Sequence, residues 1–397
     1  MDWRTSELEQ FPTLTWDEIA PQVSGATRSA LERVLEKQDG ACLSDEERYA
    51  LANCDGADLL ALLVAANTLR RDLVGNIVSY VVNRNINFTN ICFVGCKFCA
   101  FSRGPREADS YFHSLEDMGR KSKEAWELGA TEVCIQGGLP HGLPPFYYRD
   151  ILRAVKNAVP GMHIHAFSPM EIVYGVELTG MTLRDYLMML RDNGLDTLPG
   201  TAAEILDDEV RHVLSRNKLS SAQWQEVIRT AHACGIRSTS TLMYGHMETP
   251  DHWVRQLSLF RQIQTETGGF TEFVPLSFIP FHTLLGRTHG VQEISEAENL
   301  KHTAAFRLAL GTTVRNLQAS WVKMGLDAAT EALRWGVNDL GGTLMEESIS
   351  RMAGSYHGVR LEPDDLIGAA HAAGRPAAER TTLYEVRRRF EPEPVAA

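Results

Sequence analysis

The feature that most constrains the fold is a regular alternation of short apolar runs with longer helical segments after about residue 80. The short runs are typical of buried strands and lie at residues 85–91, 132–136, 163–167, 197–199, 238–244, 271–278, 316–322 and, more weakly, 339–341. The longer segments repeat apolar residues at helical spacing over residues 114–128, 146–158, 183–193, 221–234, 253–266 and 296–310. Eight such units predict an α/β fold with a parallel sheet closed into a (β/α)8 barrel of the TIM type. An open doubly wound sheet is the alternative, but no GxGxxG or P-loop motif supports it.

The regions on either side of the barrel have a helical pattern. Residues 29–37, 44–51 and 57–74 place apolar side chains at three- and four-residue intervals, and Ser44 with Glu47 has capping-box spacing. We therefore expect an N-terminal helical extension over residues 1–80, the barrel over 81–345, and a C-terminal helical region with a tail over 346–397. The charged, proline-containing end, residues 387–397, is expected to fray.

Composition excludes some classes of function. The chain has 397 residues, with 39 Lys and Arg against 51 Asp and Glu, for a net charge of −12. So acidic a chain is a poor binder of nucleic acid or of membrane surfaces. We find neither a signal peptide nor an apolar run of membrane-spanning length, and the seven cysteines suggest no disulfide framework. These features predict a cytoplasmic protein.

Polar and glycine residues gather where the predicted strands end, which is where barrel enzymes hold their chemistry. Such residues, the cysteines after the first strand included, follow all eight predicted strands and would surround one mouth. The candidates are Gln136, Gly137, Gly138, Ser168, Glu171, Thr201, Glu204, Met243, Tyr244, Gly245, His246, Lys323 and Asp339.

Three cysteines lie together directly after the first predicted strand. Cys92, Cys96 and Cys99 have the spacing CxxxCxxC, so that three thiolates could hold one compact metal centre. A structural zinc site uses four ligands, usually in two pairs, and the other four cysteines are isolated. Three ligands without a fourth suit a [4Fe–4S] cluster with one iron open to a non-protein ligand. A zinc loop or a chance cluster is the alternative.

The CxxxCxxC spacing resembles that of the radical S-adenosylmethionine (SAM) enzymes. The resemblance implies that SAM chelates the open iron and that an electron from the cluster cleaves SAM to a 5′-deoxyadenosyl radical. It also implies that Gly137 and Gly138 meet the methionine part, that Glu204 lies near the ribose, and that residues 243–248 line the adenine. The full set of expected cofactor contacts is Gln136, Gly137, Gly138, Ser168, Glu171, Thr201, Glu204, Met243 and Gly245.

Longer stretches narrow the resemblance to one branch. NRNINFTN at 83–90 and FCAF at 98–101 flank the cysteines, and further stretches are HAFSPME at 165–171, PGTAAE at 199–204, STLMYGH at 240–246 and NDLGGTLMEE at 338–347. They resemble the branch of deazaflavin (FO) synthase and the futalosine-pathway menaquinone enzymes, and within it the FO synthase subunit that joins tyrosine to a pyrimidine. The resemblance covers residues 60 to about 380.

The resemblance implies a specific reaction. It is cleavage of the Cα–Cβ bond of L-tyrosine and addition of the 4-hydroxybenzyl radical to C5 of 5-amino-6-(D-ribitylamino)uracil, a step towards coenzyme F420. With one cysteine triplet, the chain would carry one half of FO synthase. It would work with a second radical SAM subunit and an external electron donor.

The sequence identifies the acid or base of this reaction less clearly than it identifies the cysteine ligands. We choose His246, with Tyr244 and Asp339, because a group within reach of the phenol could move its proton, although a structural histidine is an equal alternative. The stretch 277–287 departs from the pattern that we expect after the sixth strand of FO synthases. Two other functions therefore stay open: a radical SAM paralogue that uses another acceptor, and a non-catalytic iron–sulfur electron carrier.

Overall fold

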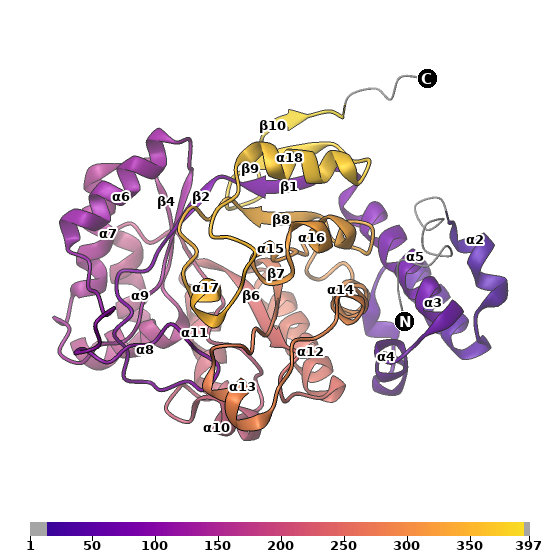
Figure 1. The fold of residues 1–397 in the computed structure, drawn as a ribbon, viewed down its shortest axis with the longest axis horizontal. Coiled ribbons are helices and arrows are strands. Elements are labelled where there is room, and N and C mark those ends of the chain that lie inside the picture. The colour runs from indigo at the N-terminus through magenta and orange to yellow at the C-terminus, as the bar shows by residue number, and fades with distance from the viewer. Residues whose placement is uncertain (1–13, 393–397) are drawn as a thin grey trace.

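A parallel sheet of six strands forms most of the barrel. The computed structural model describes residues 14–392 (Figure 1). The strands pair side by side in the order of the chain, β2 (Asn83–Ile86), β3 (Glu132–Ile135), β4 (His163–Ala166), β5 (Thr197–Leu198), β6 (Arg237–Tyr244) and β7 (Phe270–Ser277). All five pairings are parallel. Their carboxyl ends therefore share one edge.

A second sheet closes the ring. Its order is β10 (Val386–Phe390), β9 (Ala377–Arg380), β1 (Val78–Val81) and β8 (Asp339–Gly342). Only Val82 separates β1 from β2. Between β7 and β8, Leu317 and Gln318 make single parallel bridges to Phe273 and Asp339. Eight positions thus surround the interior, and the predicted (β/α)8 class is confirmed.

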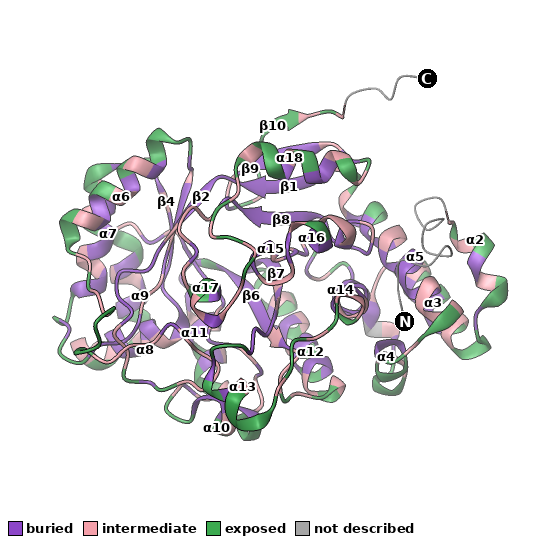
Figure 2. Ribbon diagram, in the orientation of Figure 1, coloured by how far each residue is buried: buried purple, intermediate pink, exposed green. Residues whose placement is uncertain are grey.

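Helices cover the outer face of the sheet (Figure 1). The six helices predicted between strands are α6 (Leu115–Glu127), α7 (Tyr147–Ala158), α9 (Leu183–Asp192), α11 (Ser221–Ala233), α12 (Pro250–Thr267) and α14 (Glu296–Leu310). Shorter helices not predicted from the sequence are α8 (Pro169–Thr179), α10 (Asp208–Ser215), α13 (Leu284–His289), α15 (Trp321–Met324) and α16 (Leu326–Ala332). The helices present buried apolar faces to the strands, as their periodicity predicts (Figure 2).

The N-terminal extension is helical, as predicted. It comprises α2 (Trp16–Ile19), α3 (Gly25–Lys37), α4 (Asp45–Ala52) and α5 (Gly56–Val74), with short 3₁₀ turns at Ala20–Gln22 and Gly40–Cys42. Ser44 Oγ accepts a hydrogen bond from Glu47 N at the start of α4, which confirms the capping box. Helix α5 is buried along much of its length and packs against α14 of the barrel.

Three predictions about strands are wrong. The first strand is 83–86 rather than 85–91, because the chain leaves the sheet after Ile86 to form the cysteine loop. Residues 316–322 are not a strand, since only Leu317 and Gln318 bridge and α15 begins at Trp321. The region after residue 346 holds α17 (Ile349–Ala353) and α18 (Pro363–Ala372), but then forms the unpredicted strands β9 and β10.

The end of the chain is more ordered than expected. Residues 387–390 belong to β10, which pairs antiparallel with β9, and residues 393–397 lie outside the described residues. Because β9 also pairs parallel with β1, the C-terminal region is part of the barrel's sheet.

Within residues 14–392, no single helix is both long and apolar enough to cross a membrane. Helices α4 and α5 meet those criteria only when taken together, and they are bent by 109° where they meet.

Candidate functional site

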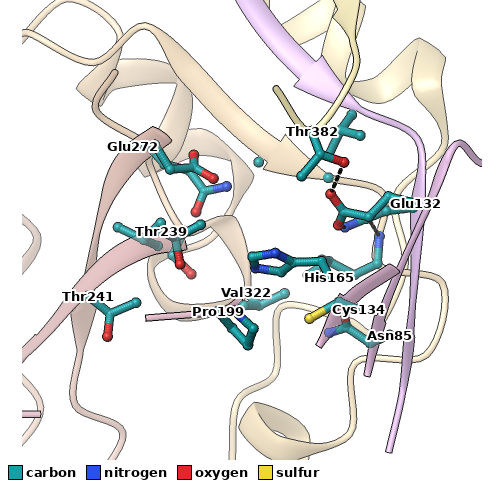
Figure 3. Close-up of a pocket in the computed structure, with 18 of the residues that line it drawn as sticks. Asn85, Glu132, Cys134, His165, Pro199, Thr239, Thr241, Glu272, Val322 and Thr382 are labelled. Atoms are coloured by element: carbon teal, nitrogen blue, oxygen red, sulfur yellow. Dashed lines mark hydrogen bonds between the residues drawn. The ribbon is translucent and has the colours of Figure 1, made fainter. Parts of the chain in front are cut away.

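Two neighbouring cavities, which share part of their walls, lie inside the barrel. The upper cavity, of about 340 Å³, is at the carboxyl ends of the strands and is lined in part by the three cysteines of the loop 92–99. The lower chamber, of about 200 Å³, lies deeper in the barrel (Figure 3). Both are lined by Asn85, Gln136, Thr201, Thr241, Leu276 and Val322. A ligand could therefore extend from one into the other.

The cysteine loop forms one wall of the upper cavity. Cys92, Cys96 and Cys99 all line it, and none is in a disulfide. Burial raises the pKa of Cys96 to about 12 and also raises that of Cys99, so these thiols are neutral and coordination of iron would release their protons. In the described part of the chain, no three His, Cys, Asp or Glu side chains converge tightly enough for a single ion. The three thiols nevertheless line the same cavity.

Two glycines at the end of β3 allow the cysteine loop to pack closely. A Cβ on Gly138 would lie 2.2 Å from the Ile91 carbonyl oxygen and 3.0 Å from Cys92 Cβ. A Cβ on Gly137 would lie 2.5 Å from the Phe88 ring. The Gly138 N–H also donates to Thr89 O at 2.8 Å. Both glycines line the upper cavity, where we predicted them, and their lack of side chains fixes the loop that carries the thiols.

We expect Gly138→Ala to lower cluster binding strongly. The added methyl group must displace the Ile91–Cys92 backbone, and a shift of that backbone moves the first thiol. Iron content after anaerobic reconstitution is the measurement. Gly368→Ala is the matched control, because a Cβ on Gly368 in α18 has no neighbour within 4 Å. Full iron content in Gly138→Ala would contradict this account.

Ser168 and Glu171 form the capping box of α8 and line the upper cavity. Glu171 Oε2 accepts from Ser168 N at 2.7 Å and from Ser168 Oγ at 2.6 Å, and its Oε1 accepts from Gly137 N at 3.0 Å. Burial raises the pKa of Glu171 to about 7. The predicted pair thus ties the ends of β3 and β4 together.

Glu204 has an unusual position on the cavity wall. Its φ is +37°, in the left-handed region, which turns its carboxylate towards Lys218 Nζ, 2.7 Å from Oε1. Its Oε2 is buried without a hydrogen-bond partner among residues 14–392. Arg211 Nη1 lies 3.7 Å from this oxygen, an ion-pair contact that is too long for a hydrogen bond. The oxygen can therefore still accept a hydrogen bond from a ligand.

Of the remaining predicted cofactor contacts, three line the upper cavity and one does not. Gln136, Thr201 and Met243 line the upper cavity, and Thr201 Oγ1 donates to Gln136 Oε1 at 2.7 Å. Gly245 does not line it, and its N–H donates to Glu248 Oε1 at 2.5 Å.

The structure does not bring the three predicted catalytic side chains to either cavity. His246 Nε2 donates to Met243 O at 3.0 Å and its Nδ1 accepts from Met247 N at 2.6 Å, while burial lowers its pKa. Tyr244 Oη donates to Asn299 Oδ1 at 2.9 Å. Asp339 accepts two hydrogen bonds from Arg380, at 2.5 and 2.9 Å. Their polar atoms are used within the protein.

Sequence reasoning missed several residues on the cavity walls. Lys218 follows α10 and pairs with Glu204, but no local motif connects the two. Glu132, His165, Glu272 and Arg380 line the lower chamber from within the strands, whereas nearly all of the predicted polar sites lie where strands end. Lys323 lines the upper cavity as predicted; burial lowers its pKa, and no carboxylate of the described residues is within ion-pair distance.

The fold and the cysteine loop define the class of protein. The family model described as Radical SAM superfamily matches residues 86–259, which span the cysteine loop and most of the parallel sheet. A second, described as CofH/MqnC C-terminal region, matches residues 267–393.

Similar proteins of known sequence narrow the class. The chain is 45% identical over 358 residues to the 5-amino-6-(D-ribitylamino)uracil–L-tyrosine 4-hydroxyphenyl transferase of Methanothermobacter thermautotrophicus, covering 90% of this chain and 98% of the relative. It is 49% identical over 388 residues to the FO synthase of Streptomyces coelicolor, covering 96% of this chain and 44% of the relative. The chain thus spans less than half the length of the FO synthases that it matches. It belongs to the radical SAM family that contains these two enzymes.

Solved structures support the fold. Methylornithine synthase has a TM-score of 0.67 at 20% identity, covering 87% of this chain and 96% of that one. The [FeFe]-hydrogenase maturase HydG of Carboxydothermus hydrogenoformans has a TM-score of 0.69 at 17% identity, covering 95% and 86%.

Proposed function

We propose that the chain is a radical SAM transferase that cleaves the Cα–Cβ bond of L-tyrosine and joins the 4-hydroxybenzyl group to C5 of 5-amino-6-(D-ribitylamino)uracil. The observation that carries the proposal is the 45% identity, over nearly its whole length, to a transferase named for these substrates. The product would pass to a second radical SAM subunit for completion of FO, and an external donor would supply the electron.

The upper cavity is suited to the cofactors. Cys92, Cys96 and Cys99 would hold three irons of a [4Fe–4S] cluster, and SAM would bind the fourth. When bound there, SAM and the cluster would supply the radical chemistry that starts from the tyrosine amino group. The Oε2 of Glu204, which has an ion-pair contact with Arg211 but no hydrogen bond within residues 14–392, would accept a hydrogen bond from a hydroxyl of the SAM ribose, while Lys218 holds the other oxygen of this carboxylate. These contacts would orient the cofactor.

Lys323 would bind the carboxylate of tyrosine. It lines the upper cavity together with Glu347, which attracts it through space, but no carboxylate of the described residues is close enough to form an ion pair with it. Burial lowers its pKa, so an anionic ligand that removes the cost of the buried charge would bind there favourably. Apolar Phe278 and Ile279 line the same cavity and would exclude water from the radical.

Phe278 and Ile279 belong to the stretch 277–287, whose sequence departs from the expected pattern. Leu285 N donates to Lys97 O at 2.8 Å, so this stretch also packs on the cysteine loop. Its place at the cavity makes it the first region to examine if the acceptor is a different molecule.

We expect the reconstituted protein, with SAM, a strong reductant, tyrosine and the ribityl uracil, to form the hydroxybenzyl adduct. Mass spectrometry measures the adduct and 5′-deoxyadenosine, with reactions lacking tyrosine or the uracil as controls. Cleaved tyrosine with unchanged uracil would reject the acceptor. Unchanged SAM with every amino acid would favour an electron carrier.

A further inference from the structure

The wall of the lower chamber carries neutral polar groups that the protein itself does not use. His165 Nε2 and the side-chain amides of Asn85 and Gln318 line the chamber. Among residues 14–392, none of these groups makes a protein hydrogen bond. Figure 3 shows the imidazole of His165 extending into the chamber towards the wall formed by Thr239. Such groups are available to a ligand.

The charged groups deeper in the chamber are paired with one another. The guanidinium of Arg380 donates to both oxygens of Asp339 and to Thr381 O, and it lies 3.5 Å from Glu272. Tyr384 Oη donates to Glu272 Oε2 at 2.5 Å.

Glu132 is likewise occupied. It accepts from Asn83 Nδ2 at 2.9 Å and from Thr382 Oγ1 at 2.7 Å, a contact visible in Figure 3. No cation of the described residues is left for a ligand carboxylate in the lower chamber. Its wall carries two carboxylates, Glu132 and Glu272, against one guanidinium, which is also bound to Asp339 behind the wall. A carboxylate such as that of tyrosine is therefore disfavoured here, and a neutral ligand is favoured.

His165 can either donate or accept at its chamber-facing nitrogen. Thr197 Oγ1 lies 2.8 Å from both His165 Nδ1 and His163 Nε2. If the Thr197 hydroxyl donates to His165 Nδ1, the Nε2 of His165 carries the proton and can donate. If the hydroxyl donates to His163 instead, His165 Nδ1 carries the proton, and the Nε2 of His165 can accept. Burial lowers the pKa of His165 to about 4, which keeps the ring neutral. A ring of this kind matches a hydroxyl group, which can also play either role.

Resting on the proposed function, we infer that the lower chamber binds the ribityl chain of the acceptor, a neutral linear polyol. His165 and Gln318 would hydrogen-bond its hydroxyls, and the uracil ring would lie above them, at the residues shared with the upper cavity. The lower chamber would thereby select an acceptor with a hydroxylated chain, while tyrosine occupies the upper cavity near Lys323.

The test measures binding without turnover. Full-length reconstituted protein is titrated calorimetrically, without reductant, with 5-amino-6-(D-ribitylamino)uracil and with 5,6-diaminouracil, which lacks the chain. His165→Asn keeps a polar group at the position of Nδ1, which faces Thr197, but removes the polar group at the position of Nε2, which faces the chamber. His165→Gln is the matched variant, because its longer side chain places an amide at the position of Nε2. Gln318→Leu tests a separate segment of the wall, and thermal unfolding checks that each variant folds.

We expect His165→Asn and Gln318→Leu each to weaken binding of the ribityl compound about five- to tenfold, the effect of one net hydrogen bond. His165→Gln should lose much less, and binding of 5,6-diaminouracil should not change. Equal binding of the ribityl compound by all variants, equal losses for both uracils, or no binding by the wild type would overturn the inference. If the selective losses occur but the wild type forms no adduct, the proposed reaction fails while the polyol site stands.

Discussion

Replacing any one of Cys92, Cys96 or Cys99 with Ala is expected to reduce iron content after reconstitution by at least about tenfold. Removing only a hydrogen-bond partner of a metal ligand already lowers metal affinity about tenfold at many sites, and removing the ligand itself should lower it more. Each thiol lines the upper cavity, and no other cysteine lies on its wall to replace it. Iron analysis and the EPR signal of the reduced cluster are the measurements. SAM cleavage should be lost in the same three variants.

The matched control is Cys134→Ala. Cys134 lines the lower chamber rather than the upper cavity, so its thiol does not face the space between the other three. This variant should keep its iron. Loss of iron in Cys134→Ala as complete as in the other three would show that the cluster has a different ligand set.

Replacing Arg380 with Met is expected to lower the free energy of unfolding by about 3–5 kcal/mol, the usual cost of removing one partner of a buried ion pair. Arg380 is 2% exposed and Asp339 is fully buried, so the substitution leaves a carboxylate without its cation. The Arg380 guanidinium also lies 3.9 Å from the centre of the Tyr384 ring, a contact that would be lost. Urea unfolding followed by tryptophan fluorescence measures the change.

Arg388→Met provides the comparison within the same C-terminal hairpin. The side chain of Arg388 is 65% exposed and pairs with Glu379, which Arg387 also contacts. Glu379 is buried, but it keeps Arg387 as a second cation when Arg388 is removed, and the exposed Arg388 gains little from the pair, about 1 kcal/mol at most. This variant should therefore unfold close to the wild type. Equal losses in the two variants would mean that the buried pair has no special role.

The sequence predicted the parts of the fold that depend on repeated patterns. Helical spacing located the six long helices of the barrel, because burial of one face requires that spacing. It did not reveal β9, where Glu379 and Arg380 read as exposed residues. Both can be buried because each has a partner of opposite charge on another strand. Arg387 of β10 neutralises Glu379, and Asp339 of β8 neutralises Arg380.

For the candidate site, the sequence predicted which segments meet but not where every side chain points. Because carboxyl ends of parallel strands meet at one edge, the cysteines, Gly138 and Glu204 were expected to share a cavity, and they do. Single side chains were harder, since neighbouring residues of a strand point to opposite faces and loops turn freely. His246 and Tyr244 sit at a strand end yet point into the protein, where backbone and Asn299 atoms bind them.

The pairing of β1 has a consequence for biosynthesis. Strands β2 to β6 each pair with the next strand to leave the ribosome, whereas β1 pairs with β8 and β9, so that Val78 must wait for Ala377. Closing so long a stretch of chain is entropically slow, and until then β1 has unpaired edges. We expect a nascent chain that lacks its last strands to depend on chaperones, because the strand made first is completed last.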